Sequence, residues 1–167
     1  VLAAICLATS PALAVVNHFT APAIPAAAQA GEDASRRLVL PQAATFEALS
    51  SDALPETITA AYVGLDDAGE AVGYVFTAKG RGFDGDITVM AAIDPMGVIV
   101  QVATIDVTSE TKTLGGQTAN ASYTDQYTGQ DSSLSGVDAI SGATITSEAY
   151  KGCVRDCFAA FDAVKGG

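Results

Sequence analysis

Hydroxyl-bearing and small side chains are concentrated near the C-terminal end of the chain, in residues 138–147, which read DAISGATITS. This segment leads into a predicted helix, whose first backbone N–H groups have no intrahelical acceptor. Thr146 or Ser147 is expected to cap the helix. The same N–H groups and the helix dipole suit a phosphate, and Gly142 allows close backbone approach or a positive φ. The residues alone fit a phosphate site or, more simply, ordinary capping.

The other reactive side chains nominate no separate catalytic centre. No nucleophile and base form an evident pair, and His18, the only histidine, lies in the apolar N-terminal segment. Cys153 and Cys157 lie four residues apart on one face of a predicted helix, a spacing that can supply two metal ligands, but no further Cys or His is near them in the sequence. We therefore expect both cysteines to be packing residues.

The elements that would position residues 138–147 belong to a predicted α+β fold. Four segments have strand character and form two hairpins around turn sequences: Thr57–Leu65, Val72–Thr77, Ile87–Ile93 and Val98–Val107. They predict an antiparallel sheet. The glycine-dense segment 80–85, GRGFDG, precedes a strand where a dinucleotide-binding loop would precede a helix, so we interpret it as a turn.

Three helices are expected beside this sheet. The C-terminal one carries an apolar stripe at three- and four-residue spacing that should pack on the sheet: Tyr150, Val154, Cys157, Phe158, Phe161 and Val164. A weaker helix is predicted over Ala119–Tyr127, and a short one over Ala43–Leu49.

The distribution of charge divides the chain into two parts. The net charge is −11, yet every charged side chain follows Gly31. An acidic chain that is half apolar is neither disordered nor a nucleic-acid binder. Residues 1–28 are long and apolar enough to be a transmembrane anchor helix, which needs about 20 apolar residues. A cleaved signal peptide ending at Ala30 and a lipoprotein signal on Cys6 are the alternatives.

Residues 138–144, DAISGAT, resemble the flavinylation motif Dxx(S/T)GAT of the FMN-binding domain family. The resemblance implies that a flavin transferase joins FMN by a phosphoester to the last threonine of the motif, Thr144, which should be partly exposed. It also implies a cofactor site around that residue, made by Ser141, Gly142, Ala143, Ile145, Thr146 and Ser147.

A wider resemblance covers nearly the whole chain and is to the G-subunit family of Rnf electron-transport complexes. It includes residues 17–24, 62–74, 85–89 and 93–97. Residues 110–115, ETKTLG, resemble the family's ETPGLG loop, with Lys112 and Thr113 replacing Pro and Gly. Further cofactor contacts are expected at the matching positions Glu110, Thr111, Leu114 and Gly115. For Glu110 a structural role in the loop is an equal alternative.

This resemblance implies a redox subunit of an ion-translocating ferredoxin:NAD⁺ oxidoreductase complex, with covalent FMN and no substrate site of its own. The expected layout is an anchor at residues 1–28, a linker and short helix at 29–52, and an extracytoplasmic FMN-binding domain at 53–167. The partners implied are the other Rnf subunits and the flavin transferase. The C subunit of Na⁺-translocating NADH:quinone reductase, a stand-alone membrane-tethered flavoprotein and a domain that binds no flavin are the alternatives.

Overall fold

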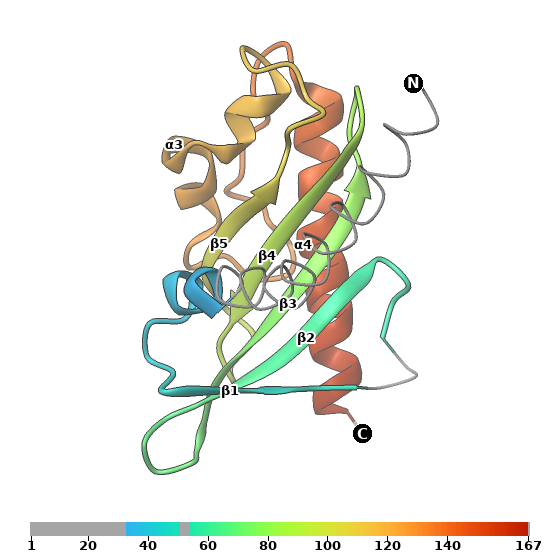
Figure 1. Ribbon diagram of the computed structural model, residues 1–167. Helices are drawn as coiled ribbons and strands as arrows, with labels where there is room; N and C mark the ends of the chain where they lie inside the picture. Colours follow the sequence, from blue (N-terminus) through green and yellow to red (C-terminus); the bar gives the residue numbers. More distant parts are fainter. Residues whose placement is uncertain (1–32, 51–53, 167) are drawn as a thin grey trace, which may run out of the picture. The chain divides into compact units, whose positions relative to one another are not determined.

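The computed structural model describes residues 33–50 and 54–166 of the chain. Within them, five strands form one antiparallel sheet in the order β1-β2-β3-β4-β5 (Figure 1). The strands are β1 (Thr45–Ala48), β2 (Ile58–Leu65), β3 (Ala71–Arg81), β4 (Asp86–Ile93) and β5 (Ile99–Asp106). Residues 33–39 are helical. After the sheet come η1 (Gly115–Ala119), α3 (Ala121–Thr124), η2 (Asp125–Tyr127) and the long helix α4 (Thr144–Lys165).

Two of the turns that join neighbouring strands are built alike. Asp66 and Asp94 each accept two backbone N–H groups from the next few residues. Gly69 and Gly97 take positive φ values of 81° and 85° in these turns. An aspartate that accepts backbone amides, followed by a glycine at positive φ, is a strong local turn signal. The predicted hairpins are therefore confirmed.

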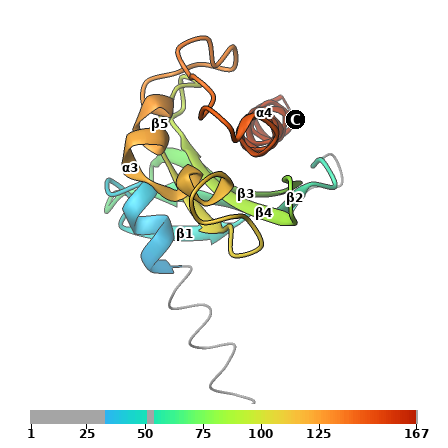
Figure 2. The ribbon, with the colours of Figure 1, turned by 90° about the horizontal axis from the view of Figure 1, so that it is seen from above.

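One face of the sheet packs against α4, which runs along it as a single layer (Figure 2). Alternate residues of β4, from Ile87 to Ile93, point to this face and are buried, as strand periodicity requires. The stripe on α4 meets them and is buried at Tyr150, Val154, Cys157, Phe158 and Phe161. The expected packing of the helix on the sheet is confirmed, and both cysteines lie in this core as free thiols.

The other face of the sheet carries a second, smaller core. Val39 and Leu40 are fully buried there and belong to one cluster with Val75, Met90 and Ala92. Buried residues on both faces of β3 and β4 make these the central strands of the fold.

The structure corrects three of the expected elements. The helix predicted over Ala43–Leu49 is wrong, because these residues contain β1, which pairs with β2 from Thr45↔Leu65 to Ala48↔Tyr62. Strand β3 continues through Gly80 and Arg81, so the turn is shorter than segment 80–85. Gly80 is required there by packing, since a Cβ would lie 2.6 Å from the Cys153 Sγ atom of α4.

The predicted helix over Ala119–Tyr127 is broken into parts of η1, α3 and η2. The predicted anchor over residues 1–28 lies outside the described residues. Among the helices that the structure does describe, none has the length and apolar character needed to cross a membrane.

Candidate functional site

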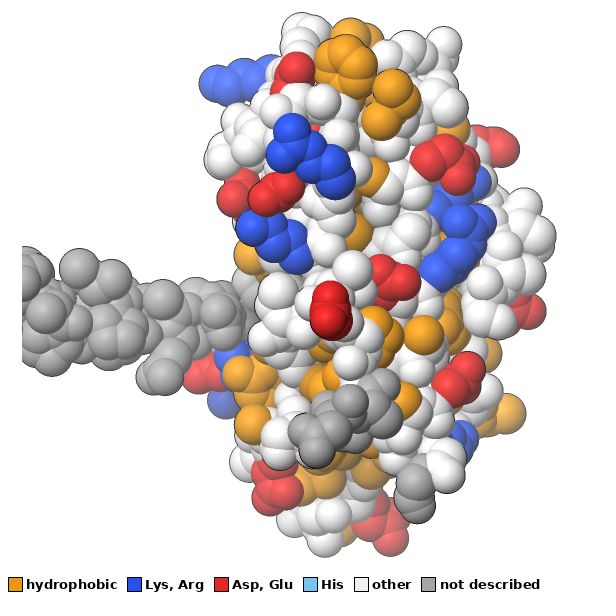
Figure 3. Space-filling model, turned by 90° about the vertical axis from the view of Figure 1, so that its right-hand side faces the viewer, with side chains coloured by type: hydrophobic (Ala, Val, Ile, Leu, Met, Phe, Trp, Pro, Cys, Tyr) orange, Lys and Arg blue, Asp and Glu red, His pale blue; other side chains and the backbone are white. Residues whose placement is uncertain are grey.

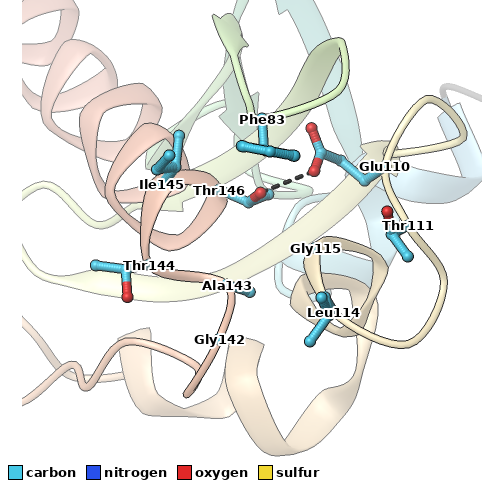
Figure 4. Close-up of a pocket in the computed structure, with 10 residues that line it drawn as sticks. All are labelled: Phe83, Glu110, Thr111, Leu114, Gly115, Gly142, Ala143, Thr144, Ile145 and Thr146. Atoms are coloured by element: carbon cyan, nitrogen blue, oxygen red, sulfur yellow. Dashed lines mark hydrogen bonds between the residues drawn. The ribbon is translucent and has the colours of Figure 1, made fainter.

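A pocket of about 360 Å³ lies beside the start of α4 (Figure 4). Its walls come from three separate parts of the chain: the turn between β3 and β4, the loop that follows β5, and the segment that enters α4. The lining residues are Phe83, Glu110, Thr111, Leu114, Gly115, Gly142, Ala143, Thr144, Ile145 and Thr146. The pocket thus joins segments that are distant in sequence.

Most of the predicted site residues meet in this pocket. Ser141 and Ser147 are the exceptions, since neither lines it. The fold therefore unites the two segments singled out in the sequence, 110–115 and 138–147, although more than twenty residues separate them.

The entry into α4 leaves its first amides free. The helix begins at Thr144, with Ala143 at the N-cap position and no side-chain cap hydrogen bond. The predicted capping by Thr146 or Ser147 is therefore wrong, because both residues lie inside the first helical turn. Gly142 has φ of 80°, which lets the chain turn into the helix. The amides of the first turn remain available to an anion.

The hydroxyl groups of this segment differ in accessibility. Thr146 is buried and donates a hydrogen bond of 2.8 Å to Glu110 Oε2. Ser147 is buried and its Oγ accepts the N–H of Ile140 at 3.0 Å. Ser141 and Thr144 are exposed, as was expected for Thr144. Of these two, Thr144 is the one at the pocket.

Glu110 is a buried carboxylate in the pocket wall, with 5% of its surface exposed. Its Oε1 atom accepts the N–H groups of Asp84 at 3.1 Å and Gly85 at 3.4 Å, while its Oε2 atom accepts Thr146. Gly82 leaves the space that the carboxylate fills, since a Cβ there would overlap Oε1. The carboxylate links the β3–β4 turn to α4, which is a structural contact, and Glu110 also lines the pocket.

The loop that holds Glu110 keeps a compact shape without proline. Thr111 accepts the N–H groups of Leu114 at 3.0 Å and Gly116 at 2.9 Å through its carbonyl oxygen. Gly115 allows the loop to approach α4, because a Cβ there would lie 2.8 Å from Thr146 Oγ1 and closer still to Glu110. Lys112 and Thr113 are therefore compatible with a closed turn here.

Phe83 is a pocket residue that was not predicted from the sequence. It stands in the turn after β3, and 65% of its surface is exposed. The glycines of this segment precede a strand, so the sequence predicts only a turn here and no dinucleotide site. A large aromatic side chain between turn glycines was the available signal.

Three buried tyrosines pack together, one of them Tyr150 of α4, and the Tyr123 hydroxyl donates to the Ser147 carbonyl at 3.3 Å. The rings of Tyr123, Tyr127 and Tyr150 are packed with centroids 5.3 to 5.6 Å apart. Burial raises the pKa of each phenol, so these hydroxyls stay protonated and act as hydrogen-bonding groups.

The electrostatics of the pocket come from the backbone and from Glu110. No Lys or Arg is among its lining residues. An anion held here would therefore rely on helix amides or on a covalent bond to the chain.

Comparisons with known proteins agree with this geometry. Residues 82–159, which contain the whole pocket, match the FMN-binding domain family. The chain is 32% identical over 163 residues to the G subunit of the Na⁺-translocating ferredoxin:NAD⁺ oxidoreductase complex of Acetobacterium woodii, covering 83% of this chain and 77% of that one. It is 33% identical over 121 residues to the G subunit of the ion-translocating oxidoreductase complex of Methanosarcina acetivorans, covering 66% and 64%.

The fold is similar to the crystal structure of Shewanella oneidensis NqrC. The TM-score is 0.56 at 19% identity, and the match covers 77% of this chain and 74% of that one. A sequence identity of 19% shows only that the two proteins share a fold. On the sequence relationships, the chain belongs to the G-subunit family of ion-translocating oxidoreductase complexes, and its pocket lies in an FMN-binding domain.

Proposed function

We propose that this chain carries FMN joined through its phosphate to Thr144 Oγ1 and transfers electrons as a membrane-anchored subunit of an ion-translocating ferredoxin:NAD⁺ oxidoreductase complex. The observation that carries the proposal is the setting of Thr144. Thr144 is exposed at the uncapped start of α4 and lines the pocket, whereas Thr146 and Ser147 are buried and their hydroxyls are hydrogen-bonded.

The residues present fit this cofactor. The uncapped amides of the first helical turn suit a phosphate, and Gly142 lets the backbone come close to it. The volume of about 360 Å³ is typical of small-molecule pockets, and apolar side chains at the pocket suit a flat aromatic ring. When bound, FMN supplies the capacity to accept and release electrons one at a time.

The chain's own residues hold and orient the group. Thr144 supplies the linking oxygen, and the small residues Gly142 and Ala143 leave room for the phosphate. No cationic side chain lines the pocket, so a covalent bond is the feature that would retain the cofactor in every redox state. The flavin transferase that forms this bond needs an accessible hydroxyl, which the exposure of Thr144 provides.

Substitution of the acceptor hydroxyl tests the covalent link. The chain is produced together with a flavin transferase, and bound flavin is measured by intact mass and by fluorescence in a denaturing gel. Thr144→Val should abolish both signals. Thr113→Val is the matched control, because Thr113 is exposed and its hydroxyl has no hydrogen-bond partner within the described part of the chain. Retention of covalent flavin by Thr144→Val would refute the proposal.

Membrane anchoring rests on residues 1–28, which carry no charged side chain. The native chain should remain in the membrane fraction after alkaline carbonate washing, as an integral protein does. The proposed extracytoplasmic location predicts that protease added to spheroplasts cleaves the FMN-binding domain. Release of the chain by carbonate would contradict membrane anchoring. Protection of the domain from protease until the cells are lysed would contradict its extracytoplasmic location.

Membership in a complex is supported by the two relatives that are G subunits of such complexes. Purification of the native chain in mild detergent should recover other membrane and redox subunits in fixed proportion. A monodisperse, flavin-bearing monomer would instead support a stand-alone flavoprotein. If the chain is instead recovered together with subunits of Na⁺-translocating NADH:quinone reductase, it would be the C subunit of that enzyme. The similarity of its fold to NqrC is the reason to test this alternative.

A further inference from the structure

The chain that follows the predicted anchor is packed on the FMN-binding domain itself. Residues 36–43, which we call the clamp, bury four side chains at three- and four-residue spacing: Arg36, Val39, Leu40 and Ala43. Three of them join the core on the face of the sheet opposite α4, and the Arg36 guanidinium lies 3.8 Å from the centre of the Tyr62 ring. The compact unit that contains the sheet begins at Ser35, so the clamp belongs to the domain.

Two opposed glycines shape the seat of the clamp. Gly64 of β2 and Gly73 of β3 are partners across the two strands. A Cβ at Gly64 would lie 2.5 Å from Leu40 Cδ2, and one at Gly73 would lie 3.0 Å from Leu40 Cδ1. Leu40 therefore fills a notch that the two glycines leave open, and it is fully buried. After the clamp, the Ala44 amide donates to the Leu65 carbonyl at 2.8 Å, so the chain runs directly into β1.

The clamp limits how far the domain can move from a membrane anchor. The predicted anchor ends at residue 28, and the first buried residue of the clamp is Arg36. The chain between them spans at most about 27 Å, since each extended residue adds about 3.4 Å. A linker that was free over residues 29–52 would reach about 80 Å by the same measure. The packing of the clamp thus removes most of the reach that the expected layout would allow.

We propose that the clamp holds the FMN-binding domain on the membrane surface, with the exposed side of the clamp against the phospholipid headgroups. The inference rests on the proposed function, because it needs residues 1–28 to be the membrane anchor. The exposed side carries Arg37 and Leu38, and Leu38 is 74% exposed. An arginine beside an exposed leucine suits the headgroup layer, where the guanidinium binds phosphate and the apolar side chain reaches the acyl boundary.

The short connection, and not a broad charged surface, carries this proposal. Acidic and basic side chains are interspersed over the face of the molecule shown in Figure 3, so charge does not select that face for the membrane. A domain held by the clamp stays at one height above the bilayer. Its flavin would then exchange electrons with partners beside it and would not travel between distant ones.

Contact with lipid is tested on the full chain in vesicles of phosphatidylethanolamine and phosphatidylglycerol that contain a lipid with a nitroxide on its headgroup. A nitrobenzoxadiazole label is placed at Leu38→Cys or, as the matched control, at Ala159→Cys, both in a Cys6→Ser background. Ala159 is exposed on α4, on the other side of the sheet from the clamp (Figure 2). Cys153 and Cys157 are buried and should stay unlabelled. The nitroxide should quench the label at position 38 and leave the label at position 159 unquenched.

A second comparison tests the short connection and the clamp. A flexible Gly-Ser segment of about twenty residues, inserted after Ala30, adds a root-mean-square reach of about 25 Å and leaves the clamp unaltered. The difference in quenching between the two labels should then be lost. Leu40→Ala empties the notch between Gly64 and Gly73 and should have the same effect with the native connection. Leu134→Ala, which truncates a buried leucine of the core on the α4 side, is the matched control and should keep the difference.

The possible outcomes separate the two proposals. If carbonate releases the native chain, membrane anchoring fails and this inference fails with it. If the chain stays in the membrane but the two labels are quenched equally or not at all, the inference is overturned while anchoring stands. If the label at position 38 is shielded only in the purified complex, a partner subunit covers the clamp and the contact with lipid is overturned. If the difference persists after the Gly-Ser insertion, the short connection does not hold the domain in place and the inference is overturned, whether or not Leu40→Ala folds.

Discussion

The hydrogen bonds of Glu110 predict a measurable coupling between two positions that are far apart in sequence. Glu110→Ala leaves the Asp84 amide, the Gly85 amide and the Thr146 hydroxyl without their acceptor. Gly82→Ala places a methyl group where Glu110 Oε1 lies. Each substitution should destabilise the fold by itself. Together they should do so by less than the sum, because the first removes the atom with which the second collides.

The magnitudes follow from burial and contact. A buried polar group left without a partner costs about 1–3 kcal/mol, and the amides of the β3–β4 turn can regain water, so Glu110→Ala should lower the free energy of unfolding by about 3 kcal/mol. Overpacking should make Gly82→Ala cost about 1–3 kcal/mol. Without the Glu110 carboxylate, the nearest remaining atom is the Gly85 carbonyl oxygen at 3.2 Å, so the same change should then cost less than about 1 kcal/mol.

The assay is a double-mutant cycle by urea unfolding, followed by far-ultraviolet circular dichroism, with flavin content matched among the four proteins. The expected coupling is about 1–2 kcal/mol in the direction of a less destabilised double variant. Glu110→Gln serves as the control for charge, since its amide oxygen still accepts the turn amides. If the two effects added to within about 0.5 kcal/mol, Gly82 and Glu110 would not share the contact described here.

Three further predictions concern glycines and cysteines. Gly142→Ala should lower the free energy of unfolding by about 1–2 kcal/mol, since φ is 80° at this position and the new Cβ would lie 3.2 Å from Leu114 Cδ2. Gly152→Ala, on an open face of α4, should instead raise the free energy of unfolding by about 0.8 kcal/mol. Equal effects of the two substitutions in urea unfolding would contradict this prediction. Burial raises the pKa of Cys153 to about 12 and that of Cys157 well above its ordinary value, so iodoacetamide at pH 8 should label these two thiols only on unfolding. Peptide mass mapping separates them from Cys6, and labelling of Cys153 or Cys157 in the folded chain would contradict their burial. Below pH 9 both the folded and the unfolded chain keep these protons, while above it only the unfolded chain releases them, so the urea midpoint should fall as pH rises from 9 towards 12; a constant midpoint would be inconsistent with the raised pKa values.

Much of the sheet was predictable because its signals are local. The turn at Asp94 and Gly97 separates two runs of β-branched and apolar residues, which pair with each other as β4 and β5. The same holds for α4, whose apolar stripe has helical spacing over its whole length. Segments of this kind bury one face in any compact arrangement, so their type depends little on the rest of the chain.

The errors arose where a tertiary partner overrides local preference. Residues 43–49 have a composition that allows a helix, but β2 offers an unpaired edge, and the Leu49 amide donates to the Ala61 carbonyl there. The sequence pattern predicts a loop at Gly80, whereas the close approach of Cys153 is what requires a residue without a side chain there. Neither partner can be identified from the neighbouring residues.

The order of residues along the chain was enough to indicate the motif around Thr144, the helix that follows it and the class of cofactor that its resemblance implies. Which hydroxyls are accessible, and which segments form the pocket, depends on the folded chain. The Thr146 hydroxyl is occupied by a hydrogen bond to Glu110, 36 residues away in the sequence, and Phe83 reaches the same pocket from the β3–β4 turn. Periodicity shows which face of an element is buried, but side chains from distant segments meet only when the chain is folded, and those contacts set the exposure and the hydrogen bonding of each group.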